Sequence, residues 1–299
     1  MPVAGAAPKA AIAQRIATAV LGRDAGSLSG VSSLSHHVFV GPDVVVKVIE
    51  GSRHRRLDRE AALAAELPAG LTAPLLGSGT FRYGAQEFRY ACYARILGTA
   101  PGMGLPGVTA AAARSLAEQA VERLRTLHAW VPSRGADRVL REPLGHGGFL
   151  DRDTLLDGIG RLASDGRLTG PVLAGLTAIA TQAPPRASVD VPVHADCHWD
   201  NWLAADGRVL ALLDFEWARW GEPLDDWFFL AAFSGPHRSV VLDVIARATG
   251  LAPDELAAGC ELREAAHLVS DLLAEPGPPP PQRARELAAL TVHRRWQRH

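Results

Sequence analysis

The chain has 299 residues, of which 47% are hydrophobic and 21% are charged, and its formal net charge is -1. This composition is typical of a globular protein and excludes disorder over most of the length. A near-neutral charge gives no general attraction to nucleic acid or to an anionic membrane, so we expect neither as a partner.

The cysteine content and the hydropathy of the chain further narrow the class of protein. Three cysteines without a C-x-x-C pair predict neither a disulfide framework nor a zinc site. The start of the chain lacks the charged and apolar pattern of a secretion signal, and no run of about 18 apolar residues indicates a membrane span. We therefore expect a cytoplasmic protein, and the length predicts two domains or one large bilobal domain.

The first third of the chain is predicted to contain helices and short strands. Helical spacing begins at residue 9 and ends at Gly22, a residue type that commonly follows a helix. Three β-rich runs separated by turn residues then predict antiparallel strands, followed by a charged helix and two more strands. These strands are expected at 27–31, 36–40, 44–49, 75–81 and 87–96, with the helix at 53–67.

Glycine and proline at 98–107 predict a boundary between two lobes, which we place at residues 1–97 and 98–299. The second lobe is expected to be mostly helical, with a mixture of helix and loop over 131–190. Its helices are expected at 110–130, 224–233, 239–249, 254–274 and 282–296, and its short strands at 191–193 and 209–213.

The densest group of polar residues lies in this second lobe. Residues 194–201 read HADCHWDN, an H-x-D-x-x-x-x-N pattern, and an apolar run then ends at Asp214. Phosphoryl transfer needs a carboxylate that orients the attacking hydroxyl and accepts its proton, together with oxygen ligands for Mg²⁺. Asp196, Asn201 and Asp214 supply this set.

These motifs resemble the aminoglycoside phosphotransferase family, whose fold is similar to that of protein kinases and of choline and homoserine kinases. The family typically reads H-G-D-x-x-x-x-N, then I-D-W/F-x-D/E, then G-D-P-x-x-D-L. Here the last two motifs are LDFE at 213–216 and GEPLDDW at 221–227. The resemblance covers residues 25–235 and implies an α+β, bilobal, protein-kinase-like fold. Its N-terminal lobe would hold a five-stranded antiparallel sheet plus a helix, and its C-terminal lobe would be mostly helical.

The resemblance assigns roles in the second lobe residue by residue. Asp196 becomes the catalytic base, and Asn201 and Asp214 become the Mg²⁺ ligands. Asp226 falls on the aspartate that braces the catalytic loop from the following helix, and His194 becomes a structural residue.

In the first lobe, VVVKV at 44–48 resembles the strand that presents the family's nucleotide-binding lysine. Lys47 is therefore expected to bind the α- and β-phosphates and to pair with Glu60 on the following helix. Only two of the 31 basic residues are lysines, and Asn201 is the single asparagine. Because the composition otherwise favours arginine, as in GC-rich genomes, a lysine and an asparagine at these two positions indicate a chemical requirement.

The remaining nucleotide contacts are also implied by the resemblance. The backbones of Ala94 and Ile96 fall at the family's hinge and are expected to contact the edge of the purine. Ser32 and Ser33 lie in a serine-rich turn whose hydroxyl and N–H groups are expected to cradle phosphate.

Several residues keep two interpretations. Glu216 is interpreted as a structural or substrate-facing carboxylate, with a role near Mg²⁺ as the alternative. Trp217 and Trp220 are candidates for the acceptor pocket or for the core. Four aspartates fit either an acidic wall for a polycationic substrate or helix caps and solvated helix faces, which we favour: Asp151, Asp153, Asp157 and Asp165. Two residues depart from the family pattern, Ala195 at its glycine and Glu222 at the aspartate of its G-D-P motif, and we expect the alanine to be tolerated.

The function implied is a nucleotide-dependent kinase that uses Mg²⁺ and ATP or GTP to phosphorylate a hydroxyl-bearing small molecule. The expected acceptor is an aminoglycoside or other antibiotic, a nucleoside or a sugar, and the expected role is antibiotic resistance or self-resistance. One alternative is a housekeeping kinase for a sugar, amino alcohol or amino acid. An alternative of another class is a catalytically silent, kinase-like binding protein. Protein-kinase activity is disfavoured because Asp214-Phe215 is followed by Glu216 and no A-P-E motif is present.

Overall fold

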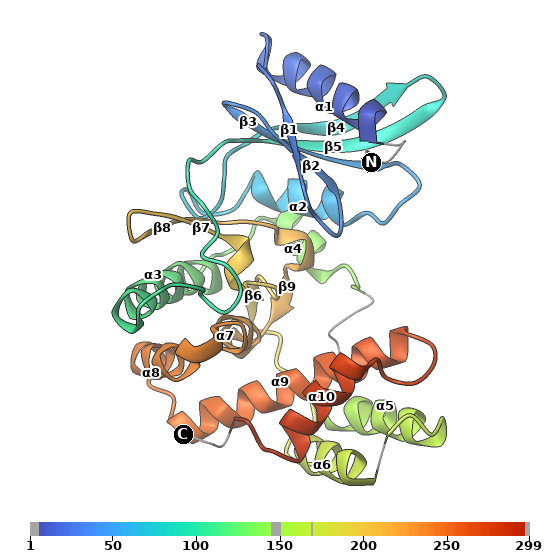
Figure 1. Ribbon diagram of the computed structural model, residues 1–299, viewed down its shortest axis with the longest axis vertical. Coiled ribbons are helices and arrows are strands. Elements are labelled where there is room, and N and C mark those ends of the chain that lie inside the picture. Colours follow the sequence, from blue (N-terminus) through green and yellow to red (C-terminus); the bar gives the residue numbers. More distant parts are fainter. Residues whose placement is uncertain (1–5, 145–150, 169, 297–299) are drawn as a thin grey trace. The chain divides into compact units, whose positions relative to one another are not determined.

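The computed structural model, drawn in Figure 1, describes residues 6–144, 151–168 and 170–296. Contacts between residues divide the chain into two units. Unit 1 comprises Met1–Pro101, Ala129–Arg141 and Asp200–Ala218. Unit 2 comprises Gly102–His128, Glu142–Trp199 and Arg219–His299. Each unit is thus built from separate stretches of chain, and the single boundary expected before residue 98 stays a prediction.

A five-stranded antiparallel sheet forms the centre of unit 1, which confirms the predicted sheet. The strand order is β1-β2-β3-β5-β4. The strands are β1 (Ser29–Val31), β2 (His37–Val40), β3 (Val44–Glu50), β4 (Leu75–Tyr83) and β5 (Gln86–Ala94). Lys47 lies in the middle strand, opposite Val38 of β2 and Ala91 of β5, so hydrogen-bonded neighbours fix its backbone on both sides.

The two faces of this sheet carry different helices, because successive side chains of a strand point to opposite faces. Val46 is fully buried in a core with helix α1 (Ala6–Leu21), whereas Ile49 packs in a second core with helix α2 (Arg56–Ala64). Lys47 shares the parity of Ile49 and faces α2. Figure 1 shows α1 and α2 on opposite sides of the sheet.

The rest of unit 1 consists of short elements. A hairpin joins β7 (Trp202–Ala205) to β8 (Arg208–Leu212), and a 3₁₀ helix η2 (Phe215–Trp217) follows. Helix α4 (Arg134–Arg141) also belongs to this unit. The sequence predicts β8 but not β7, whose four residues, Trp-Leu-Ala-Ala, show no alternation of apolar and polar side chains.

Unit 2 is mostly helical, as predicted. Its helices are α3 (Ala110–His128), α5 (Arg152–Ser164), α6 (Gly170–Ala180), α7 (Pro223–Ala232), α8 (Arg238–Thr249), α9 (Pro253–Ala274) and α10 (Pro281–Thr291), with a short 3₁₀ helix η3 (Gly235–His237). Strands β6 (Val191–Val193) and β9 (Arg219–Gly221) form a two-stranded antiparallel sheet. The 3₁₀ helix η1 (Trp199–Asn201) lies where the chain passes from unit 2 to unit 1. Among the described helices, none is long and apolar enough to cross a membrane.

Several predicted elements end earlier in the structure than in the sequence interpretation, and β5 and α10 show why. Strand β5 ends at Ala94 rather than residue 96, because its partner β3 begins at Val44 and leaves no strand beyond that pair. Helix α10 ends at Thr291 rather than residue 296, because the chain turns toward α9. There Arg294 Nε donates to Glu261 Oε1 (2.9 Å) and Trp296 Nε1 donates to Glu264 Oε2 (2.5 Å).

Close packing of α6 against α10 leads to a first prediction. A Cβ placed on Gly175 of α6 would overlap the side chain of Thr291 and lie 3.1 Å from its Cα, whereas one on Gly160 of α5 would meet nothing within 4 Å. We expect Gly175→Ala to lower the free energy of unfolding by about 1–3 kcal/mol through overpacking. The matched control Gly160→Ala should raise it by about 0.5–1 kcal/mol, because alanine favours helix. Chemical denaturation of both variants measures these changes, and an equally stable Gly175→Ala protein would contradict the packing described.

Candidate active site

Lys47 forms the centre of a buried group of charges in unit 1. Its Nζ donates to both carboxylate oxygens of Glu60, at 2.8 and 2.9 Å, and to Asp214 Oδ1 at 3.0 Å. Lys47 lies in β3 and Glu60 lies in α2. Asp214 lies just beyond the end of the β7–β8 hairpin. These contacts join residues that lie far apart in the sequence. They bring together the lysine and two acidic residues to which the family resemblance assigned roles in binding the nucleotide and Mg²⁺.

The charges of this group depend on one another. Burial acts to lower the pKa of Lys47, but the carboxylates of Glu60 and Asp214 outweigh it and hold that pKa above its ordinary value. Burial raises the pKa of Glu60 to about 7, against the attraction of the Lys47 ammonium. Lys47 therefore stays charged, and its positive charge offsets the free-energy cost of placing the carboxylates of Glu60 and Asp214 away from water.

Asn201 and Asp214 are brought together by the β7–β8 hairpin. Trp202 and Leu212 face each other at its open end, and Leu213 N donates to Asn201 O at 2.7 Å. Asn201 is 8% exposed. Asp214 adopts a left-handed backbone conformation, with φ 67° and ψ 58°, which is rare for a residue other than glycine and is found most often where function requires it.

Arg59, on α2 beside Glu60, ties this helix to the segment that follows Asp214. Its Nε donates to Ala218 O at 2.9 Å, and one of its terminal nitrogens donates to Leu140 O of α4 at 3.3 Å. The arginine is buried. Arg59 therefore anchors the helix that carries Glu60 to the segment that follows Asp214. The sequence analysis did not predict this contact.

The loop around Asp196 belongs to unit 2 and is organised by Asp226 of α7. The Asp226 carboxylate accepts hydrogen bonds from His194 N (3.1 Å), Ala195 N (2.7 Å) and His128 Nε2 (2.9 Å). Asp196 N donates to His194 Nδ1 at 3.2 Å, and the Asp196 side chain is 23% exposed. Asp226 thus lies in position to brace the loop, and His194 supports the backbone of Asp196.

The departure at Ala195 has a backbone consequence. Ala195 has φ 62°, a left-handed conformation that glycine adopts without penalty and that costs other residues about 1–2 kcal/mol. The family's glycine at this position therefore has a physical reason. In this chain the strained conformation is held by the hydrogen bond from Ala195 N to Asp226.

This geometry predicts that Asp226→Asn lowers the free energy of unfolding by about 2 kcal/mol, because an amide cannot accept all three hydrogen bonds as a carboxylate does. Burial alone would raise the pKa of Asp226, but hydrogen bonds and charge from His128 and His194 hold it below its usual value. An acid whose pKa is lower in the folded state stabilises the fold above about pH 4 and loses that contribution as pH falls. Unfolding measured from neutral to acidic pH should thus show a smaller acid-induced loss in the variant. Equal acid sensitivity of the two proteins would contradict this role of Asp226.

Glu216 is buried and joins three parts of unit 1. Ser35 Oγ donates to its Oε1 at 2.7 Å, and Arg56 Nε donates to its Oε2 at 3.0 Å. Burial raises the pKa of Glu216, aided by the nearby charge of Asp214. The expected structural role of Glu216 agrees with these contacts. The sequence analysis did not predict Ser35 and Arg56 as partners of Glu216. It identified only the serine-rich turn in which Ser35 lies.

The other predicted nucleotide contacts lie on the same unit. Ser32 and Ser33 are exposed in the turn between β1 and β2. Ala94 ends β5, where its N–H donates to Pro74 O at 2.8 Å, and Ile96 is half-buried beyond it. Their assignment to phosphate and purine stays a prediction.

The remaining candidates are placed as follows. The Trp217 ring lies under the Arg56 guanidinium at 4.3 Å, and Trp220 lies in β9 opposite Pro192 of β6. Asp151 caps α5, where its side chain accepts a hydrogen bond from Thr154 N at 2.9 Å, which agrees with the helix-cap interpretation. Glu222 caps α7 in a capping box with Asp225. The assignment of the two tryptophans to an acceptor pocket stays a prediction.

Comparisons with known proteins bear on the family and the fold. The family model described as "Phosphotransferase enzyme family" matches residues 28–261. The GDP complex of wild-type aminoglycoside 2′-phosphotransferase-IIIa is similar in structure, with a TM-score of 0.70, 16% identity and coverage of 93% of this chain and 95% of that one.

Two further solved structures are similar over nearly their whole length. The ADP-bound aminoglycoside phosphotransferase APH(2″)-Ib gives a TM-score of 0.63, 16% identity and coverage of 94% of this chain and 96% of that one. Macrolide 2′-phosphotransferase type I gives a TM-score of 0.61, 19% identity and coverage of 98% of this chain and 97% of that one. The comparison with curated proteins gives no match. These structures share the kinase-like fold with the present chain, and, because the family model covers more than half of its residues, the chain belongs to the phosphotransferase enzyme family.

Proposed function

We propose that this protein transfers the γ-phosphoryl group of ATP or GTP to a hydroxyl group of a small natural product, with an aminoglycoside or macrolide antibiotic as the leading class of acceptor. The observation that carries the proposal is the Lys47 ammonium held between Glu60 and Asp214, with Asn201 adjoining Asp214 through the hairpin. The similar structures of an aminoglycoside phosphotransferase and a macrolide phosphotransferase support the acceptor class. The biological role would be antibiotic resistance or self-resistance.

Nucleotide binding in this proposal uses groups from strand β3, from helix α2, from the end of strand β5 and from the β1–β2 turn. The Lys47 ammonium, a compact point charge, would bind the α- and β-phosphates while Glu60 holds it in position. Because the Ala94 N–H is engaged with Pro74, its carbonyl and the backbone of Ile96 would face the purine. The exposed serines of the β1–β2 turn would contact the phosphates.

The donor set near Asp214 fits Mg²⁺, which prefers carboxylate and amide oxygens. Asn201 and Asp214 would hold this ion, and a bound Mg²⁺ neutralises charge on the phosphates during transfer. In the present arrangement the Lys47 ammonium partly balances Asp214. Phosphate groups that attract Lys47 would leave more of the Asp214 charge for the metal.

Asp196 would act as the base of the reaction. Its carboxylate would accept a hydrogen bond from the acceptor hydroxyl, orient the oxygen toward the γ-phosphorus and take the proton as the new O–P bond forms. Asp226 would serve this step indirectly, since it fixes the backbone just before Asp196. The free thiols of Cys92, Cys197 and Cys260 are buried, which is typical of a reducing compartment, and we propose that the reaction takes place in the cytoplasm.

Release of nucleoside diphosphate in a coupled assay tests the proposal. ATP and GTP would each be supplied with Mg²⁺ and a panel of aminoglycosides, macrolides, nucleosides, sugars and amino alcohols. We expect diphosphate release that depends on an antibiotic acceptor. Turnover of primary metabolites alone would overturn the resistance role, and failure to bind either nucleotide would favour a silent, kinase-like binding protein.

A further inference from the structure

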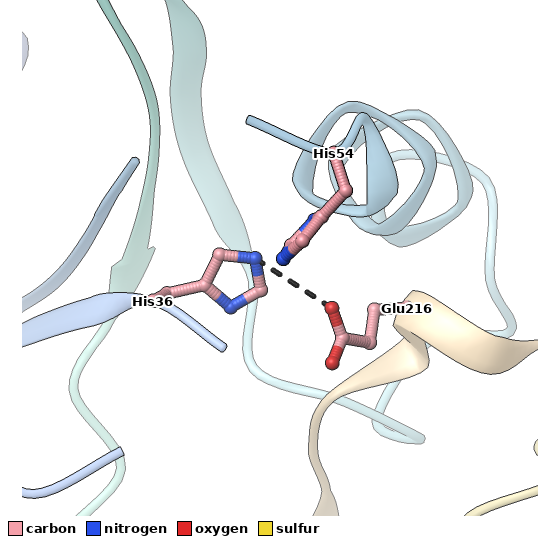
Figure 2. A group of neighbouring side chains, drawn as sticks. All are labelled: His36, His54 and Glu216. Atoms are coloured by element: carbon pink, nitrogen blue, oxygen red, sulfur yellow. Dashed lines mark ion pairs between the residues drawn. The ribbon is translucent and has the colours of Figure 1, made fainter. Parts of the chain in front are cut away.

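Two histidines and one glutamate converge in unit 1 beside the predicted nucleotide site (Figure 2). His36 lies at the end of the serine-rich turn, His54 just before α2 and Glu216 in η2. We propose that His36, His54 and Glu216 form a binding site for a transition-metal cation of the zinc class, separate from the Mg²⁺ ligands Asn201 and Asp214.

Two ring nitrogens at this site lack the partners that buried polar atoms normally have. His36 Nε2 and His54 Nδ1 are buried, and neither has a hydrogen-bond partner among the described residues. The His36 side chain is 1% exposed. Buried polar atoms without partners cost free energy, and an unplaced ion is one of the standard explanations for them.

The spacing of the ligand atoms suits a tetrahedral metal. One atom from each of the three residues lies within 4.8 Å of the other two. His36 Nε2 and Glu216 Oε2 are 3.6 Å apart, too far for a hydrogen bond but close to the edge of about 3.4 Å expected for a tetrahedron with ligands about 2.0–2.1 Å from Zn²⁺. Figure 2 shows the His54 ring directed toward the same space from the segment just before α2.

The ligand types select the class of metal. Two imidazoles and one carboxylate, with a fourth position open to water, form a set that Zn²⁺ commonly accepts. Burial and the nearby cations keep the pKa of His36 at about 4, so its imidazole is neutral and its lone pair is available at neutral pH. Mg²⁺ requires oxygen ligands in octahedral geometry and would not favour two nitrogens.

Arg56 already holds a positive charge against this site, and it would compete with a metal. Its Nε donates to Glu216 Oε2 at 3.0 Å, and a terminal nitrogen lies 3.0 Å from His54 Nε2. If His54 Nδ1 bound a metal, the ring proton would have to be on Nε2. That N–H would then point at the N–H donor of Arg56, and the two groups could not form a hydrogen bond. Arg56 would therefore withdraw from His54 and Glu216, and the face of Trp217, 4.3 Å away, remains available to it.

The charges around the site would allow a metal cation to take the place of the Arg56 guanidinium. Three carboxylates face the region, from Glu60, Asp214 and Glu216. Among the described residues, Lys47 and Arg56 are hydrogen-bonded to these carboxylates, and Arg53 and Arg89 add positive charge near His54. A second possible group, His36 with Glu60 and Asp214, is also close enough to bind a metal. Lys47 Nζ is hydrogen-bonded to both of those carboxylates, so that group already contains its cation. His54 belongs only to the proposed site, which makes it the residue to test.

Calorimetric titration of the full chain with Zn²⁺, in excess Mg²⁺, tests the proposal, with Co²⁺ absorption reporting nitrogen ligands. We expect binding of one ion, weakened about tenfold or more by His54→Gln and unchanged by the control His293→Gln, an exposed histidine. Arg56→Met should tighten binding, because it removes the competing cation. This opposite effect cannot arise from loss of folding. Equal affinity in wild-type and His54→Gln proteins, or no binding to either wild-type or Arg56→Met protein, would overturn the site.

Discussion

Replacing Asp196 by asparagine is expected to reduce turnover by about 100- to 10,000-fold, the range typical of a lost general base, while leaving nucleotide affinity unchanged. Asparagine keeps the size of the side chain and its reach toward a hydroxyl, but it cannot accept the proton. Asp226 and His194 hold the backbone of the loop, and asparagine keeps the shape of the Asp196 side chain, so the fold should persist.

A matched variant separates this role from a general effect on the loop. Asp200 lies in the same loop region and is exposed. Asp200→Asn removes the same charge and should retain turnover. The turnover number and the nucleotide dissociation constant would be measured for both variants. Wild-type turnover in Asp196→Asn, or an equal loss in Asp200→Asn, would refute the assignment of Asp196 as the base.

Replacing Lys47 by methionine should reduce turnover by about 100-fold or more and weaken nucleotide binding. The ammonium is the group that would contact the phosphates, and Glu60 and Asp214 lose their shared partner when it is removed. Because Lys47 opposes the burial that raises the pKa of Glu60, its removal should raise that pKa beyond about 7. Glu60 would then bind a proton in the folded state near neutral pH.

The sign of the resulting pH dependence follows from proton binding. A carboxyl whose pKa is higher in the folded than in the unfolded state holds more protons when folded, so stability falls as pH rises between the two values. Lys47→Met should therefore be more stable at pH 5 than at pH 8. Lys47→Arg keeps the positive charge beside Glu60 and should show a smaller difference between the two pH values, although its forked guanidinium should still impair turnover. Denaturation at the two pH values measures the difference, and its absence in Lys47→Met would contradict the described coupling.

The sequence predicted most of the scaffold because the signals involved are local. The β-rich run of β3 and turn residues on either side of β2 indicate the sheet, and helical periodicity indicates α3 and α7. The ends of elements were less accurate where tertiary contacts decide them. The segment after Thr291 carries helix-forming residues, but its arginines and Trp296 bind α9 instead.

The candidate site was predictable only where the chemistry is carried by a motif. Asp196, Asn201, Asp214 and Lys47 stand in recognisable patterns. By contrast, Ser35 contacts Glu216 across 181 residues and Arg59 contacts Ala218 across 159, and neither has a local signal that distinguishes it from other serines or arginines. The partners of a buried carboxylate depend on how distant segments meet, which a single sequence does not encode in any short pattern.

Mass spectrometry of the acceptor after incubation with nucleotide and Mg²⁺ tests the central claim most directly. The protein would be supplied with ATP or GTP and an aminoglycoside or macrolide, with Asp196→Asn as the inactive control. We predict a phosphomonoester on an acceptor hydroxyl, formed by the wild-type protein and absent with the variant. Nucleotide hydrolysis with an unmodified acceptor across the whole panel, or equal product from the variant, would contradict the proposed phosphotransferase reaction.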